Sequence, residues 1–282
     1  MSAFVTRFAP SPTGRLHRGH AFSALTAWTA AQAAGGRFLL RIEDTDFTRC
    51  RSEFEAAIYE DLAWLGLRWE APVRRQSEHR DAYAAALERL RDMGVLYRDF
   101  RTRKEVLAAT AGAPHADDPA DVRAFIGGPP SSDEEAERLA RGEPFAWRLS
   151  LARASGRVGD VAALTWREEG HDPGLRHATP ERLGDVILAR KDIGPGYNVA
   201  AVLDDALQGV THVIRGVDLA EVTSVHRLMQ ALLDLPTPVY RHHPLLLGSD
   251  GLRLSKREGA EALGAIRARG VSAAQLRAEL GF

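Results

Sequence analysis

Apolar runs of strand length alternate with stretches of helical periodicity along most of this chain. The strand-like runs are at residues 4–9, 38–42, 186–189 and 211–214, and the helical patterns are at 16–33, 53–65, 201–207 and 223–233. Such alternation is typical of a parallel sheet with helices on both faces. We therefore predict an α/β fold built on a doubly wound parallel sheet, whose ligand binds beyond the carboxyl ends of the strands.

The middle third of the chain breaks this alternation. It contains a basic run at 98–104, a stretch rich in proline, glycine and acidic residues at 113–137, and a capped helical pattern at 133–141. Short helical patterns return at 260–269 and 273–280. We predict the first half of a nucleotide-binding fold in 1–95, an inserted α+β subdomain in 96–184, the second half in 185–245, and a loop with a short helical tail in 246–282. The alternative for 113–130 is a solvated segment without a packed core.

Composition narrows the protein class. With 45% hydrophobic and 27% charged residues, the 282-residue chain has the make-up of a soluble globular protein. It has no apolar run long enough to span a bilayer, and its N-terminus lacks a basic-then-apolar leader, so we expect a cytoplasmic protein with no membrane contact. The single cysteine, Cys50, excludes an internal disulfide. A net charge of −1 means that any RNA contact depends on local basic patches.

The most informative polar pattern, RFAPSPTGRLHRGH at residues 7–20, follows the first strand. A turn rich in proline, serine, threonine and glycine ends the strand, and a helix opens with His17 and His20 on one face of its first turn. Backbone N–H groups at a helix N-terminus favour a bound phosphate, and imidazoles there can add donors. No Gly-Lys-Ser/Thr follows, so the turn is not a P-loop. The alternative to phosphate binding by His17 and His20 is that they are capping or core histidines.

Four motifs in order carry a family resemblance. The run at 7–20 resembles the HIGH signature of class I aminoacyl-tRNA synthetases in its glutamyl form, with Arg18 at the position usually held by isoleucine. GRFLLRIEDTD at 36–46 is similar to a strand and loop of glutamyl-tRNA synthetases. YNVA at 197–200, with the acidic pair at 204–205, and THVIRGVDL at 211–219 are similar to that family's second half-site. LRLSKR at 252–257 resembles its KMSKS loop. The resemblance implies the Rossmann-like fold of class I synthetases.

The resemblance implies that glutamate is activated by ATP, with Mg²⁺, to give glutamyl-adenylate. Its catalytic residues would be His17, His20 and Lys256. ATP would lie against Pro10, Gly19, His17, His20, Ser255 and Lys256, and glutamate against Arg7, Ala9, Ser11, Glu43, Tyr197 and Arg215.

The chemistry of the glutamate residues fits such a substrate, because arginine forks bind carboxylates and a glutamate side chain can bind the ammonium. Which arginine holds the side-chain carboxylate stays open. The alternatives are structural ion pairs of Arg215 with Asp218 and of Arg7 with Asp44 or Asp46.

Two questions about ions depend on residues near these motifs. Four acidic residues have open roles: they can bind Mg²⁺ with ATP, ribose hydroxyls or an RNA 3′ end, or can cap helices. They are Asp44, Asp46, Asp204 and Asp205.

Glutamyl-type synthetases without an anticodon domain often hold zinc in the insertion through a Cys-x-Cys pair. Asp99 and Arg101 occupy those positions here, so we predict no zinc and no other metal site.

The sequence ends soon after the Ser-Lys motif, which resembles the truncated paralogues known as the glutamyl-queuosine tRNA(Asp) synthetase family. That resemblance implies glutamate activation without tRNA, transfer to queuosine in the anticodon loop of tRNA(Asp), and a monomer. RNA contacts would come from residues 98–104 and 253–257 with Arg267 and Arg269, and the alternative is solvated surface arginines. Two other functions stay open: a catalytic fragment that charges the tRNA(Glu) 3′ end, and a non-catalytic paralogue that binds an amino acid or RNA.

Overall fold

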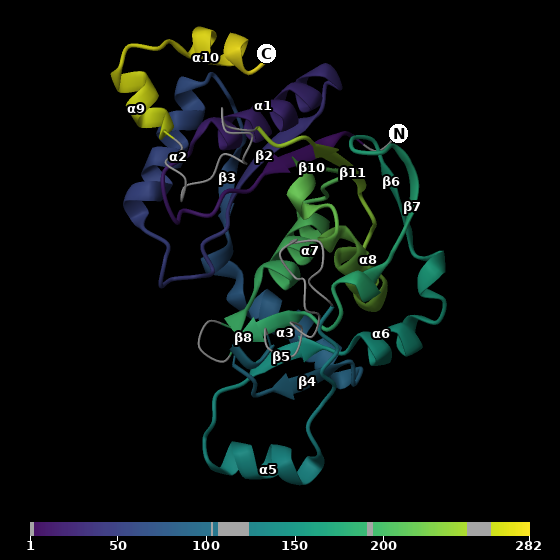
Figure 1. Ribbon diagram of the computed structural model, residues 1–282. Coiled ribbons are helices and arrows are strands. Elements are labelled where there is room, and N and C mark those ends of the chain that lie inside the picture. Colours follow the sequence, from purple (N-terminus) through teal and green to yellow (C-terminus); the bar gives the residue numbers. More distant parts are fainter. Residues whose placement is uncertain (1–2, 103, 107–123, 191–193, 247–260) are drawn as a thin grey trace, which may run out of the picture.

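A parallel sheet assembled from two distant segments forms the centre of the computed structural model, which describes residues 3–102, 104–106, 124–190, 194–246 and 261–282 (Figure 1). The first segment supplies β1 (Val5–Phe8), β2 (Arg37–Ile42) and β3 (Glu70–Arg75), and the second supplies β10 (His212–Gly216) and β11 (Val239–His243). β1 and β10 are neighbours, and the amide of Thr211 donates to the carbonyl of Val5 at 2.9 Å. The resulting order β3-β2-β1-β10-β11 reverses between β1 and β10, which confirms the doubly wound sheet.

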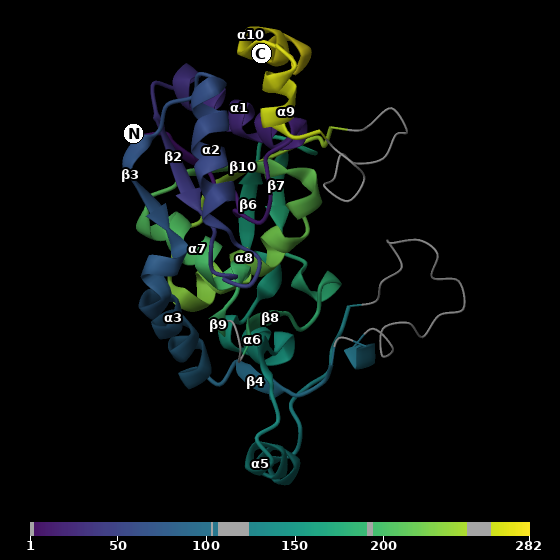
Figure 2. The same ribbon diagram turned by 90° about the vertical axis from the view of Figure 1, so that its left-hand side faces the viewer.

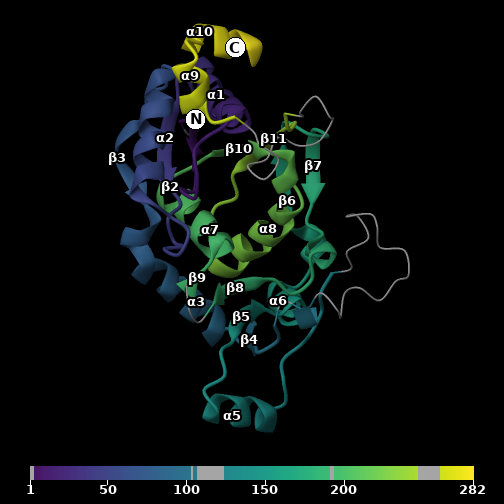
Figure 3. The same ribbon diagram turned by 60° about the vertical axis from the view of Figure 1, so that its left-hand side comes forward.

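The alternation of side chains along each strand divides the helices between the two faces. Phe38, Leu40 and Ile42 of β2 join a buried cluster with α1 (Arg18–Ala33) and α2 (Ser52–Trp64). Leu39 and Arg41 point to the opposite face, where α7 (Tyr197–Leu207) contacts Arg41. Figure 3 shows α7 and α8 (Val222–Leu233) side by side, away from α1. The predicted strands and helices of both halves are therefore present, with ends that differ by a few residues.

The insertion takes part in a separate antiparallel sheet, whose last two strands lie beyond residue 184. Its strands are β4 (Leu96–Asp99), β5 (Ala146–Leu149), β8 (Ile187–Arg190) and β9 (Gly194–Pro195). We expected residues 186–189 to belong to the parallel sheet, and this prediction is wrong, because β8 pairs antiparallel with β5. A short apolar run shows that a strand forms but does not show which strand it pairs with. The division of the chain at residues 95, 184 and 245 stays a prediction.

The rest of the insertion reaches in two directions. Two arms carry α5 (Ser132–Ala140), which lies at the opposite end of the molecule from the C-terminus (Figures 1 and 2). A hairpin of β6 (Thr165–Glu168) and β7 (Gly174–His177) instead joins the edge of the main sheet, where β6 runs parallel to β11. The insertion therefore contributes a strand to the sheet that carries the candidate site.

The remaining helices complete the two ends of the molecule. α3 (Arg80–Asp92) packs against α7 and α8, and α6 (Leu151–Val158) packs against α8. The tail forms α9 (Leu263–Ala268) and α10 (Ala273–Glu279) as predicted, and their buried leucine and isoleucine side chains join the cluster of α1 and α2. Short 3-10 helices lie at Gln76–His79, Val161–Ala163, Pro180–Arg182 and Val217–Leu219. Within the described residues, no helix combines the length and apolar character that crossing a bilayer requires.

Candidate active site

One face of the sheet carries a row of polar side chains at the carboxyl ends of its central strands. On each of four neighbouring strands a buried apolar residue is followed two positions later by an arginine or a histidine, on the same face. The pairs are Leu39 and Arg41 on β2, Val5 and Arg7 on β1, Val213 and Arg215 on β10, and Tyr240 and His242 on β11. The four apolar members form one buried cluster beneath the row. The parallel strands therefore bring polar groups from both halves of the chain to one edge.

Arg7 and Arg41 share one carboxylate. Arg7 Nε donates to Asp205 Oδ1 at 2.9 Å, and Arg41 Nη1 donates to the same oxygen at 2.8 Å. Burial alone would raise the pKa of Asp205, but the two guanidinium groups outweigh it and lower the pKa to about 2. The alternative pairing of Arg7 with Asp44 or Asp46 is wrong, because Arg7 pairs with Asp205 of α7. Arg7 and Arg41 are thus balanced by the protein itself.

Glu43 follows β2 directly and lies against this pair. Its Oε1 is 3.6 Å from Arg41 Nη2, and its backbone amide donates to the carbonyl of Pro10 at 3.0 Å. Burial raises the pKa of Glu43 to about 7, although Arg41 and Arg7 act to lower it. A cation bound here, such as an ammonium group, would favour the ionised carboxylate.

Arg215 lies among neutral acceptors instead. Its Nε donates to His242 Nε2 at 3.1 Å, and its Nη2 donates to Thr223 Oγ1 at 2.7 Å. Nη1 lies 3.3 Å from both the Tyr197 hydroxyl and His226 Nδ1. Among the described residues it forms no ion pair, so the alternative pairing with Asp218 is wrong. A buried guanidinium with no carboxylate partner is costly to keep, and it offers a binding place for an anionic ligand.

The expected glutamate-binding side chains lie close together. The pKa of the Tyr197 hydroxyl is raised, first by burial, and it responds to the charges of Arg215, Glu43 and Arg7. The turn that carries Ala9 and Ser11 follows β1 and is tied to the Glu43 backbone through Pro10. The structure thus gathers two cations, one titratable carboxyl group and a phenol at the reversal of strand order, where doubly wound sheets bind ligands.

His17 and His20 form a capping box at the start of α1. His17 Nδ1 accepts from the amide of Gly19 and His20 Nδ1 accepts from the amide of His17, both at 3.1 Å. The capping alternative is therefore correct as a description of the contacts. It leaves the ring proton on Nε2 of each histidine, which is the donor that a phosphate oxygen needs. A Cβ at residue 19 would lie 3.0 Å from the His17 ring, so glycine permits this close packing.

Ser255 and Lys256 lie outside the described residues, but the segments on either side of them are anchored beside α1. His243, at the end of β11, lies 3.1 Å from Ser23 Oγ of α1 through its Nε2. Ala262 forms a bridge with His17, and the amide of Leu263 donates to the carbonyl of Leu16 at 2.8 Å. The chain therefore leaves the described structure shortly after a residue that contacts α1, and it re-enters beside His17.

Three of the acidic residues with open roles serve the fold. Asp204 accepts from Arg74 Nε at 2.7 Å and from the Tyr83 hydroxyl, so it ties α7 to β3 and α3. Asp44 accepts from the amide and the hydroxyl of Ser77, and Asp46 closes a local turn at residue 48. Within the part of the chain that the structure describes, no three histidine, cysteine or acidic side chains gather as a metal site.

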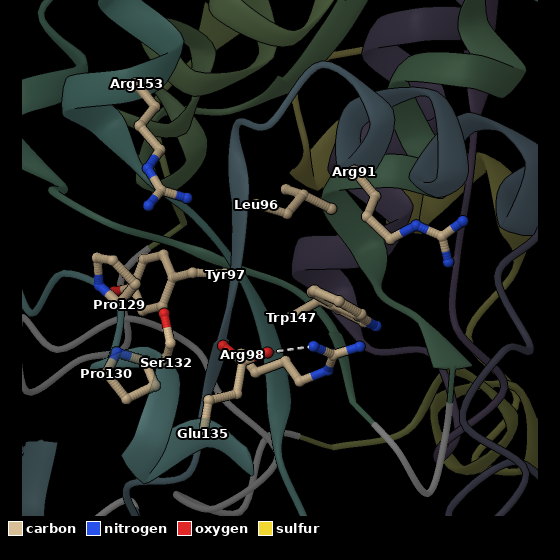
Figure 4. A pocket seen from close by; sticks show the side chains of 10 residues that line it. All are labelled: Arg91, Leu96, Tyr97, Arg98, Pro129, Pro130, Ser132, Glu135, Trp147 and Arg153. Carbon is tan, nitrogen blue, oxygen red and sulfur yellow. Dashed lines mark hydrogen bonds and ion pairs between the residues drawn. The ribbon is translucent and has the colours of Figure 1, made fainter. Parts of the chain in front are cut away.

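A separate pocket of about 310 Å³ lies in the insertion (Figure 4). Arg98 crosses it, paired with Glu135 and with its guanidinium 4.6 Å from the centre of the Trp147 ring. Arg101 is held by Asp99 at 2.6 Å, and Asp99 also binds Arg148. Arg98 and Arg101 of the expected RNA-binding run are thus engaged within the protein, and phosphate contact would require them to exchange partners, while Arg103 lies outside the described residues.

Several residues of the site were not predicted from the sequence. Arg41 belongs to the GRFLLRIEDTD motif, and its position two residues after Leu39 was a usable signal that it shares a face with Arg7 and Arg215. Glu168 and His226 had no such signal, because only the folded chain brings β6 and α8 to Arg215 and its neighbour His242.

Comparison with known proteins gives consistent results. A family model described as tRNA synthetases class I (E and Q), catalytic domain, matches residues 3–280. The chain is 44% identical to the glutamyl-Q tRNA(Asp) synthetase of Rhodobacter capsulatus, across 99% of this chain and 100% of that protein. It is 42% identical to the protein of the same name from Nocardia farcinica, covering 97% of this chain and 82% of the other.

Longer relatives match with part of their length. The glutamate–tRNA ligase of Prochlorococcus marinus is 37% identical over 95% of this chain and 55% of its own length. The crystal structure of glutamate-tRNA synthetase from Elizabethkingia anophelis superposes with a TM-score of 0.71 at 28% identity, over 92% of this chain. This chain spans about half the length of that structure, 53%.

Proposed function

The chain belongs to the class I tRNA synthetases of the glutamate and glutamine (E and Q) type, a family of ligases, and from this premise we propose that it activates glutamate with ATP. The observation that carries the proposal is the pairing of charges at the strand reversal. Arg215 lacks a carboxylate partner among the described residues, and Glu43 needs a cation to ionise fully. An amino acid with a second carboxylate supplies both missing charges.

In the proposed reaction, Arg215 holds the side-chain carboxylate and Glu43 holds the ammonium. The α-carboxylate stays outside the arginine fork, since a carboxylate in a salt bridge is a poor nucleophile. Its oxygen forms a bond to the α-phosphorus of ATP as the bond from that phosphorus to pyrophosphate breaks. His17 and His20 donate from Nε2 to phosphate oxygens, at a helix N-terminus that itself favours negative charge.

Two further groups act on the phosphates in this proposal. Mg²⁺ enters with ATP and neutralises part of the triphosphate charge. Lys256 supplies a second cation as the five-coordinate phosphorus forms. Pro10 and Gly19 border the space for the nucleotide.

For the acceptor, we propose queuosine in the anticodon loop of tRNA(Asp), with the protein acting as a cytoplasmic monomer. The support is the 44% identity, over their whole length, to a protein named glutamyl-Q tRNA(Asp) synthetase. Transfer to the 3′ end of tRNA(Glu) is the second candidate, favoured by relatives named glutamate–tRNA ligase, two of which are 37% and 39% identical.

The test is glutamate-dependent exchange of pyrophosphate into ATP, with and without RNA. We expect exchange without RNA, followed by transfer of labelled glutamate to tRNA(Asp) that contains queuosine. The control tRNA(Asp) carries guanine at the same position and should stay unlabelled. Exchange that requires tRNA(Glu) would support the second candidate, and a lack of exchange would support a binding protein without catalysis.

A further inference from the structure

A buried chain of hydrogen bonds leads from the insertion to Arg215. Glu168, the last residue of β6, places Oε2 2.7 Å from His242 Nδ1. His242 Nε2 in turn accepts from Arg215 Nε at 3.1 Å. All three side chains are 5% exposed or less, so water does not screen these contacts.

The geometry fixes the proton positions. A guanidinium N–H can only donate, so the Nε2 atom of His242 carries no proton. The imidazole proton therefore lies on Nδ1 and points to the Glu168 carboxylate, and the histidine is neutral. Burial would raise the pKa of Glu168, but the hydrogen bonds from His242 outweigh it and lower the pKa, and burial lowers the pKa of His242.

Glu168 is itself held firmly. Its Oε1 accepts from the amides of His242 and Gly170, each at 2.9 Å. The backbone after β6 runs close against β11, and a Cβ on Gly170 would lie 2.2 Å from the carbonyl oxygen of His242. The carboxylate thus binds both the ring and the backbone of the same histidine.

We infer that Glu168 and His242 are positioning residues that orient Arg215 for the carboxylate of the amino acid substrate. Glu168 fixes the His242 tautomer, His242 presents an acceptor to Arg215 Nε, and the Nη atoms of the fork then face Tyr197 and Thr223. Because His242 is neutral, no described residue compensates the guanidinium charge of Arg215 before substrate binds. All four Arg215 acceptors come from the second half of the fold by sequence, but the residue that orients His242 comes from the insertion. This inference rests on the proposed function.

The test uses pyrophosphate exchange with three variants of the full chain. His242→Leu removes the acceptor and should raise the KM for glutamate about 10- to 100-fold, the effect of losing a hydrogen bond to a charged group, with little change in the KM for ATP. His242→Gln can accept from Arg215 and donate to Glu168, so it should restore most of the affinity. Arg227→Met is the control, since it removes another contact between α8 and β6, the bond to the Thr165 carbonyl, without touching Arg215. It should change the KM for glutamate by about twofold or less.

A spectroscopic measurement separates positioning from general stability. In ¹⁵N-labelled protein, His242 should show the Nδ1–H tautomer and a proton resonance shifted far downfield by the Glu168 carboxylate. Glu168→Gln should move that resonance upfield and raise the KM for glutamate while the protein stays folded. An unchanged KM for glutamate in folded His242→Leu, or an Nε2–H tautomer, would overturn the inference. Absence of exchange in the unaltered protein would instead contradict the proposed function, and the tautomer could still be read.

Discussion

The buried arginines in the two halves of the polar row have opposite kinds of partner. On β1 and β2, Arg7 and Arg41 share the carboxylate of Asp205, and Arg41 also lies near Asp204. On β10, Arg215 contacts a tyrosine, a threonine and two neutral histidines. Within the described parts of the chain, the same residue type at equivalent positions of neighbouring strands is thus paired with a carboxylate in one place and with neutral groups in the other.

This contrast distinguishes arginines with a structural role from an arginine with a binding role. A buried ion pair holds its members in place, and removing one partner leaves a costly charge. An arginine surrounded by dipoles keeps its geometry but still lacks an anion, so a substrate carboxylate gains the interaction that the protein does not supply. We therefore assign Arg7 and Arg41 mainly to organising the site and Arg215 to holding glutamate.

The largest expected effect is on the balanced side. Asp205→Asn removes the carboxylate that the two buried guanidinium groups share, and we expect it to lower the free energy of unfolding by about 3–5 kcal/mol. Urea titration of the variant beside the unaltered protein measures this loss. A change below about 1 kcal/mol would show that Asp205 does not balance the pair.

Arg215→Met should weaken glutamate binding without lowering stability. We expect the free energy of unfolding to stay the same or to rise, because an unbalanced buried charge is removed. The KM for glutamate should rise by about 100-fold or more, since a buried charge contact of about 2–5 kcal/mol is lost. Exchange kinetics at varied glutamate and at varied ATP measure both constants. Equal losses in stability from Arg215→Met and Asp205→Asn would contradict the distinction between the arginines paired with Asp205 and Arg215.

The raised pKa of Glu43 predicts that glutamate binding depends on pH. Its pKa of about 7 in the free protein means that it is increasingly protonated as pH falls below that value. Binding an ammonium requires the carboxylate, so the KM for glutamate should rise about tenfold per pH unit below the pKa and level off above pH 8. Glu43→Gln should weaken binding and remove this slope. A slope that persists in the variant would place the titrating group elsewhere.

Tyr197→Phe should have the smallest effect. It removes one neutral acceptor of Arg215, at 3.3 Å, from a residue that is 37% exposed as a whole. We expect a three- to tenfold rise in the KM for glutamate, about 1 kcal/mol, without a change in stability. An effect as large as that of Arg215→Met would mean that the phenol itself binds the substrate.

The sequence predicted the parts of this structure that depend on local order. Strand and helix patterns gave the doubly wound sheet, and the two histidines of the 7–20 run lie at the start of a helix as expected. Pairing across long distances was not predictable. Nothing near Arg7 indicates Asp205, which lies 198 positions away, and the β8 pattern does not show that its partner is β5.

The surroundings of Arg215 illustrate the same limit. Its motif identified the arginine, but the acceptors come from α7, α8 and β11, and Glu168 behind them comes from the insertion. An ion pair with a nearby aspartate was a reasonable alternative by sequence, and only the fold shows that Arg215 is left unbalanced.

A crystal structure with bound glutamate tests the central claim most directly. We predict that the side-chain carboxylate lies about 3 Å from the Nη atoms of Arg215, while Arg7 keeps its contacts with Asp205. Glutamate whose side-chain carboxylate is bound by Arg7 in place of Asp205, with Arg215 still surrounded by its neutral acceptors, would contradict the account.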